Sequence, residues 1–153
     1  MNTALDLVIS DITNIDRVLQ YYRDELIDYE TNLTIQNKRI DKAVVEQTGW
    51  FSFYDTRRAE LKSIYEYLDM QLSIVHSIKW QKLTEKHNRE LTQKDKEVYI
   101  KNDPEYINTS ILVLHTKEVY DQYVSAVDSF KMRGYCLNNL TKLRTSNQED
   151  WVI

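Results

Sequence analysis

Apolar residues in the first third of the chain recur at alternating intervals of three and four. This spacing predicts one amphipathic helix of the coiled-coil type, which begins at a capping box of Thr3 and Asp6 and ends near Gly49. Such a helix is a rod of roughly 60 Å, so its apolar seam must pack against another helix or another copy. The seam runs through Leu5, Val8, Ile12, Ile15, Leu19, Tyr22, Leu26, Tyr29, Leu33, Gln36, Ile40 and Ala43. We take Ile12, Ile15, Leu19, Leu26 and Leu33 as candidate oligomerisation residues.

A second helix is predicted from about residue 55 to about residue 100. An aromatic cluster precedes it, at Trp50, Phe51, Phe53 and Tyr54, and we interpret this cluster as a hinge packed by its own rings. An exposed aromatic patch for a partner is the alternative. The seam of this helix is apolar from Leu61 to Val75. The same spacing then passes through cations, at Lys79, Lys82, Lys86, Arg89 and Lys96.

This change from an apolar to a basic face allows two interpretations. A row of cations beside an aromatic ring, here Trp80, is typical of sites that follow the backbone of a single-stranded nucleic acid and stack its bases. The other interpretation is a helix that leaves the core with a solvated basic face, its lysines paired to Glu85 and Glu90. Composition alone slightly favours the solvated face.

The third predicted helix begins at Pro104, with Asp103 as its N-cap, and continues to about Leu143. Gly134 falls on its apolar seam, where a side chain is expected. We interpret this glycine as a close contact, either between helices or between subunits. A second group of cations lies around it and beyond it, at Lys131, Arg133, Lys142 and Arg144.

Composition supports an all-α fold, because the 153 residues include only two glycines and one proline. We predict three long helices in a single structural domain. Residues 1–48 form the heptad helix, residues 49–145 the remaining helical region, and residues 146–153 a loose tail. No apolar run is long enough to span a membrane. The single cysteine, Cys136, fits a reducing cytosol.

Charge is segregated along the chain, although its net value is only −4. Residues 1–46 and 97–128 are acidic, whereas residues 76–96 and 129–148 are basic. Charge that is segregated in this way indicates surfaces for charged binding partners, which the net charge hides. The sequence offers no glycine-rich phosphate loop, no metal-ligand spacing and no group of nucleophile, base and orienting residue. We therefore expect no enzymatic activity and no cofactor or metal.

Four segments, in order, carry a resemblance to a known family. The first holds Trp50, Tyr54, Asp55, Arg57, Arg58, Glu60 and Leu61. The second and third are the lysine-rich IKWQKLTEKHNREL and then DKEVYIKNDPEYI. The last is AVDSFKMRGYCLNNL, whose Arg-Gly-Tyr centre is the most specific element. On these segments the chain from Trp50 to Arg144 resembles the UvsY family, the recombination mediators of large tailed phages.

The resemblance implies a helical protein that assembles into a ring-like homo-hexamer or homo-heptamer. Such proteins bind single-stranded DNA and help a RecA-like phage recombinase displace the phage single-strand-binding protein, here in the cytoplasm of an infected bacterium. They do no covalent chemistry. The family's DNA-binding motif corresponds to Lys79 and Lys82. With the resemblance, the DNA interpretation outweighs the solvated face. The candidate DNA contacts are Lys79, Trp80, Lys82, Lys86, Arg89, Lys96, Lys131, Arg133, Lys142 and Arg144.

Two other functions stay open on the sequence. A structural coiled-coil assembly protein would be explained by the N-terminal heptads alone. A helical adaptor that binds only the recombinase would use Arg133 and its neighbours for that partner rather than for DNA.

Overall fold

The structure is a computed structural model that describes residues 3–86 and 90–146 of the chain. These residues form helices and no strand, so the predicted all-α class is confirmed. The number of helices differs from the three predicted, because the described residues contain two long helices and several short ones. The elements are α1 (Ala4–Ser10), the 3₁₀ helix η1 (Ile12–Asn14), α2 (Ile15–Glu25), α3 (Tyr29–Leu33), α4 (Ile40–Lys86), α5 (Gln93–Lys101) and α6 (Pro104–Thr145).

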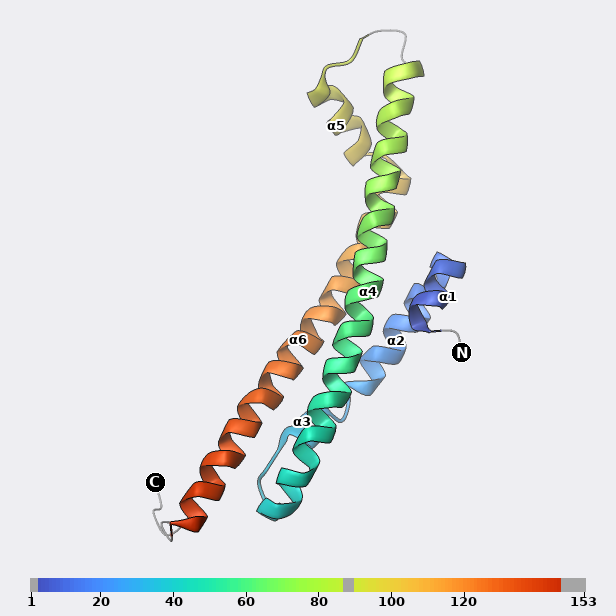
Figure 1. The fold of residues 1–153 in the computed structure, drawn as a ribbon. Coiled ribbons are helices and arrows are strands. Elements are labelled where there is room, and N and C mark those ends of the chain that lie inside the picture. The colour runs from blue at the N-terminus through green and yellow to red at the C-terminus, as the bar shows by residue number, and fades with distance from the viewer. Residues whose placement is uncertain (1–2, 87–89, 147–153) are drawn as a thin grey trace.

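Two long antiparallel helices form the frame of the molecule (Figure 1). Helix α4 has 47 residues and α6 has 42, and they pack against each other along most of their length. The short helices α1, α2 and α3 run along the half of this hairpin that contains the start of α4. Helix α5 lies beside the other end of α4 (Figure 1). The molecule is therefore an elongated rod, with a three-helix half and a thinner tip.

The N-terminal segment starts as predicted, since Thr3 and Asp6 form the capping box of α1. The prediction of one continuous helix to near Gly49 is wrong. The backbone leaves the helix at Asp11, whose carboxylate accepts hydrogen bonds from the backbone N–H and the hydroxyl of Thr13. It leaves the helix again between α2 and α3, and once more between α3 and α4, where Asn37 has a φ of 60°. Asp, Asn and Thr bond the local backbone and so compete with a helix, which the heptad pattern does not register.

Helix α4 begins at Ile40 and passes through the predicted hinge without a break. The prediction that Gly49 ends a helix is wrong, because Gly49 lies inside α4. The second predicted helix also ends earlier than expected, at Lys86, and α5 is a separate helix. The boundary expected after residue 48 therefore falls inside α4. By contrast, α6 starts as predicted, with Pro104 in its first turn and the Asp103 carboxylate accepting from two backbone N–H groups.

The apolar seam of the N-terminal segment is used inside the chain. Ile15 and Leu19 are buried in the core, and Ile12, Leu26 and Leu33 pack against it while partly exposed. These five residues were candidates for oligomerisation. Ile15 and Leu19 are used up inside the chain, whereas for the partly exposed Ile12, Leu26 and Leu33 the role stays a prediction. Their spacing did identify the buried face correctly, because a helix broken by turns can still present one apolar side to its neighbours.

Aromatic rings fill the centre of the core, around Tyr54 of α4. Tyr54 is fully buried, and its ring stacks on Phe130 of α6 with centroids 4.9 Å apart. Tyr29 of α3 meets it edge-on at 5.8 Å, and Tyr123 of α6 lies 6.1 Å away. The four rings come from three helices, so this cluster joins α3, α4 and α6. The cluster predicted as a hinge or exposed patch is thus part of the hydrophobic core.

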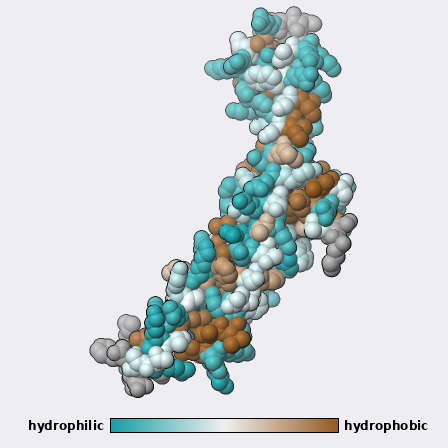
Figure 2. All heavy atoms as spheres, in the orientation of Figure 1, coloured by the Kyte–Doolittle hydropathy of each residue, from teal (hydrophilic) through white to brown (hydrophobic). Residues whose placement is uncertain are grey.

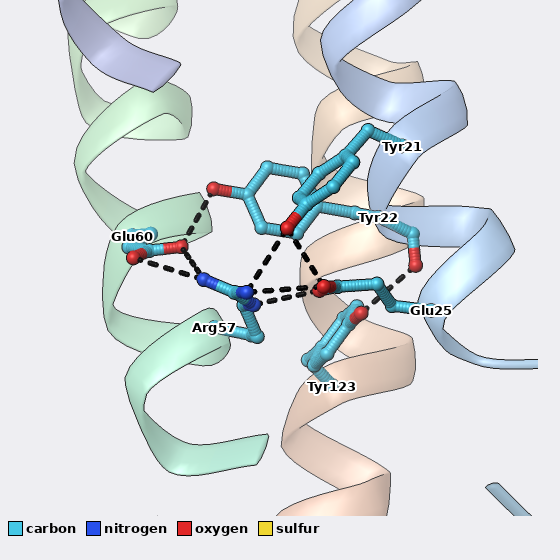
Figure 3. Close-up of polar contacts among 6 residues, drawn as sticks. All are labelled: Tyr21, Tyr22, Glu25, Arg57, Glu60 and Tyr123. Atoms are coloured by element: carbon cyan, nitrogen blue, oxygen red, sulfur yellow. Dashed lines mark hydrogen bonds and ion pairs between the residues drawn. The ribbon is translucent and has the colours of Figure 1, made fainter. Parts of the chain in front are cut away.

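A polar network fixes α2 against α4 at the edge of this core (Figure 3). Arg57 of α4 donates through Nε and Nη2 to the two carboxylate oxygens of Glu25, at 2.6 and 3.0 Å, and through Nη1 to Glu60 at 3.1 Å. The Tyr22 hydroxyl donates to Glu60 at 2.8 Å, and burial together with this bond raises the pKa of Tyr22. Tyr123 donates to the Tyr22 carbonyl oxygen, which ties α6 to the same point. Charge-assisted, two-pronged contacts of this kind set both distance and orientation.

The two glycines are expected to respond to substitution in opposite ways. A Cβ at Gly49 would meet nothing within 4 Å, so Gly49→Ala should stabilise the protein by about 0.5–1 kcal/mol through helix propensity. A Cβ at Gly134 would lie 3.0 Å from Gln47 Nε2, which is itself held by the Phe130 carbonyl oxygen at 2.6 Å. Gly134→Leu should therefore destabilise by roughly 1–3 kcal/mol. Urea unfolding followed by circular dichroism measures both, and a Gly134→Leu protein as stable as wild type would contradict the contact.

The Arg57 network predicts a difference between two neighbouring arginines. Arg57→Met removes the charged donor to Glu25 and Glu60, which keep only the tyrosine hydroxyls, and should lower the free energy of unfolding by about 2 kcal/mol. Arg58 makes only an exposed ion pair with Asp55 one turn away, so Arg58→Met should cost less than about 1 kcal/mol. Equal losses in the same urea titration would show that Arg57 does not hold α2 in place.

Candidate nucleic-acid interface

The basic part of α4 lies at the tip of the molecule, where α5 and the start of α6 meet it (Figure 1). Lys79, Lys82 and Lys86 follow one another at intervals of three and four, so they share one side of the helix. A hollow of about 280 Å³ lies beside them, and it is lined by Lys79, Lys82, Leu83, Tyr99, Ile100 and Asp103. The predicted stripe therefore exists as a surface, but its members differ in their contacts.

Lys79 is occupied by acidic partners within the chain. Its ammonium lies 2.8 Å from Glu105 and 3.2 Å from Asp103, and its side chain is only 20% exposed. The bonds to Glu105 and Asp103 raise the pKa of Lys79. Burial works against the charged form of Asp103, but the backbone N–H of Tyr106 and the Lys79 ammonium outweigh it and lower the pKa of that carboxyl. Lys79 thus joins α4 to the start of α6, and a phosphate would have to compete with two carboxylates for it.

Trp80 is half-buried and packs within the tip. Its ring stacks on His76 with centroids 5.9 Å apart, and Lys96 Nζ of α5 lies 5.1 Å from the ring centroid. The same ammonium donates to Thr84 Oγ1 at 2.9 Å. His76 Nε2 lies 3.1 Å from Glu97 Oε1, which also holds α5 to α4. Trp80 and Lys96 therefore contact each other, and Lys96 is engaged inside the chain.

Lys82 and Lys86 are the cations of the stripe that face solvent. Both are exposed, and neither forms an ion pair or hydrogen bond with any residue among 3–86 and 90–146. Their acidic neighbour Glu85 accepts a hydrogen bond from Gln81. Arg89, the next predicted member, lies outside the described residues. The predicted pairing of these two lysines with Glu85 and Glu90 is therefore wrong, whereas both lysines do face solvent, as the solvated-face interpretation also requires.

Arg133 is buried, so its predicted place in a basic surface patch is wrong. The residue is 3% exposed, and its guanidinium donates to the Leu33 carbonyl oxygen at 3.0 Å, the Ala43 carbonyl oxygen at 3.2 Å and Gln47 Oε1 at 2.6 Å. Burial lowers the pKa of Arg133. Leu33 is the last residue of α3, so Arg133 binds the carbonyl end of that short helix and connects it to α4 and α6.

The other members of the second group stand at the far end of α6. Lys131 is paired with Asp128 at 3.2 Å, while Lys142 and Arg144 are exposed near the C-terminal end of the helix. This end and the α4 tip lie at opposite ends of the rod (Figure 1), and α6 alone is roughly 60 Å long. The structure therefore does not bring the two predicted basic groups together.

Two lysines of the tip were missed by the sequence analysis. Lys94 and Lys101 of α5 are exposed, and neither forms an ion pair within the described part of the chain. They fall outside the spacing that singled out the stripe, because the sequence was assumed to continue as one helix. The turn residues before α5, where Thr92 and Asp95 form a capping box, are the signal that could have located it.

In comparisons with known proteins, no family model, curated protein or solved structure matches this chain. Within the described residues, no helix is both long and apolar enough to cross a bilayer.

Substitutions at Arg133 and Lys142 should differ in their effect on stability, because Arg133 is a buried structural cation and Lys142 is an exposed one. Arg133→Met removes three hydrogen bonds from a buried site and should lower the free energy of unfolding by about 2–3 kcal/mol. Lys142→Met, the same change at an exposed position of α6, should alter it by less than about 0.5 kcal/mol. Thermal unfolding of both variants measures this, and a neutral Arg133→Met would contradict the anchoring role.

Proposed function

We propose that this protein is a recombination mediator that binds single-stranded DNA through the tip formed by α4 and α5. In this role it helps load a RecA-like recombinase in place of the single-strand-binding protein, and it does so without enzymatic chemistry. The DNA-binding part rests on the free cations of the tip. The recombinase and the single-strand-binding protein as partners rest on the resemblance of residues 50–144 to the UvsY family.

The single observation that carries the DNA proposal is the pair Lys82 and Lys86. They are solvated and unpaired within the described residues, and one helical turn separates them on α4. Lysines in this state neutralise phosphates and release counterions, which is the main source of sequence-independent affinity for nucleic acid. Lys94 and Lys101 of α5 add cations at the same tip.

A single tip offers few phosphate contacts, so the proposal includes several copies acting together. We propose a ring-like homo-oligomer, as the resemblance implies, because each copy then adds its tip to one DNA strand. The shape of the chain supports assembly: it exposes 10780 Å², against about 8,100 Å² for a compact monomer of its mass. Large apolar side chains are 40–63% exposed on the thin half of the hairpin, at Met70, Ile74 and Ile78 on α4 and at Ile107, Ile111 and Leu114 on α6.

Hydrophobic residues gather in more than one place on the face shown in Figure 2, including the side of α4 below the tip. In this proposal, the exposed apolar side chains of the thin half of the hairpin form the contacts between copies, in place of the N-terminal heptads. The alternative of a structural coiled-coil protein rested on those heptads. Because much of that seam packs inside the chain, the heptads give this alternative less support than the sequence suggested, and it stays a prediction to be tested.

The proposal predicts a specific change in salt dependence. Replacing Lys82 and Lys86 together with Ala should weaken binding to a fluorescent oligothymidylate and reduce the slope of log K against log salt by about 0.7 for each lost phosphate contact. Fluorescence anisotropy across a salt series measures both quantities.

A matched control carries the same change of charge on the same helix. Lys42 and Lys62 lie on α4 away from the tip, and each is within 4 Å of a glutamate one turn away. Lys42→Ala combined with Lys62→Ala should leave the salt slope unchanged. If the Lys82/Lys86 variant keeps the wild-type slope, the tip is not the DNA site.

A further inference from the structure

We infer that α5 is a clasp: it covers the Trp80 side of α4 in the free protein and moves off it when single-stranded DNA binds. This inference rests on the proposed function, because it concerns how the same tip is regulated.

Helix α5 lies between the two parts of the predicted site, the Trp80 ring and the lysines of α4. On one side, Lys96 of α5 contacts the Trp80 ring and Thr84. On the other side, Tyr99 and Ile100 of α5 line the hollow that also contains Lys79 and Lys82. Helix α5 therefore separates the aromatic side of α4 from its basic side. With α5 removed, Trp80 and the lysines would form one continuous surface of the kind that binds bases and phosphates together.

Helix α5 covers the face of the Trp80 ring on which a base would stack. A base stacks on the face of an aromatic ring, and Lys96 Nζ lies over the Trp80 ring at 5.1 Å from its centroid. Stacking at that position requires Lys96 to leave. The displaced ammonium can then pair with a phosphate, so the same lysine that closes the clasp in the free protein contributes to DNA binding in the bound state.

Helix α5 is short, and most of its residues are exposed. It has nine residues, which is shorter than a helix that is stable alone in water. Ile100 is its one buried residue, whereas Val98 and Tyr99 are about half exposed. Its side-chain bonds to α4 include those of Lys96 to Thr84 and of Glu97 to His76, and all four of these side chains are partly or fully exposed. Such an element opens more readily than the helices that form the core.

The test weakens the clasp without changing any charge. Thr84→Val removes the oxygen that holds Lys96 and keeps the shape of the side chain. It should tighten binding to oligothymidylate by about two- to fivefold, with the salt slope unchanged. The Thr84 hydroxyl donates to the Trp80 carbonyl oxygen, and the Thr141 hydroxyl of α6 makes the same bond to the carbonyl oxygen four residues earlier. Thr141→Val is therefore the matched control and should bind DNA as wild type does.

A second variant closes the clasp. In a Cys136→Ser background, Thr84→Cys and Lys96→Cys give two thiols on facing helices, and a short bis(methanethiosulfonate) reagent spans the gap that the long Lys96 side chain now fills. The crosslinked form should bind at least about tenfold more weakly than the same protein after the crosslink is cleaved by a reductant. Equal binding by the two forms, with the crosslink verified by mass spectrometry, would overturn the clasp, as would a Thr84→Val variant that binds more weakly than wild type.

A spectroscopic readout separates failure of the clasp from failure of the proposed function. With 5-fluorotryptophan incorporated, the ¹⁹F resonance of Trp80 should move when oligothymidylate is added, whereas that of Trp50, which is partly buried against the core in the other half of α4, should not. If DNA binds with the predicted salt slope but the Trp80 resonance stays in place, only the clasp fails. If wild-type protein binds no DNA even at low salt, the proposed function fails and the clasp fails with it.

Discussion

The packing of α6 against α4 is the interaction on which the rest of the structure depends. Its centre is Tyr54, which is fully buried and stacked on Phe130. Neither long helix could bury its apolar face alone, and the three short N-terminal helices have no other surface on which to pack. Because large aromatic rings fill this contact, small changes in the distance between the helices would leave voids or clashes.

Two arginines extend this central contact into polar anchors. Arg57 of α4 fixes α2 through Glu25, and it also holds Glu60 of α4, which accepts from Tyr22 of α2. Arg133 fixes the end of α3 through the Leu33 carbonyl oxygen. Both anchors lie in the three-helix half of the rod. At the tip, the short and mostly exposed helix α5 covers α4 instead of three helices, and its Lys96 and Glu97 bond to α4 at partly exposed positions. This division places rigidity in one half and leaves the other half able to rearrange on binding.

The hydrophobic pattern was sufficient to predict helices and the inward side of the N-terminal segment, and the capping residues Asp103 and Pro104 were sufficient to predict the start of α6. It was not sufficient to predict where helices end, because Asp11 and Asn37 act through local hydrogen bonds and backbone conformation rather than through periodicity. The same limit applies to the site. Spacing identified Lys82 and Lys86 correctly as exposed cations, but Arg133 looked equivalent to them in the sequence. Its role depends on oxygen atoms of Leu33, Ala43 and Gln47, which are brought to it only by the tertiary fold.

The central claim is that a basic tip, repeated in an oligomer, binds single-stranded DNA. Its most direct test is to measure the mass of the wild-type protein in solution and its affinity for a fluorescent oligothymidylate in the same buffers, from low to high salt. The account predicts a discrete oligomer whose affinity falls steeply as salt increases. A discrete oligomer that binds no DNA at the lowest salt would contradict the claim and would leave an assembly protein without a nucleic-acid role.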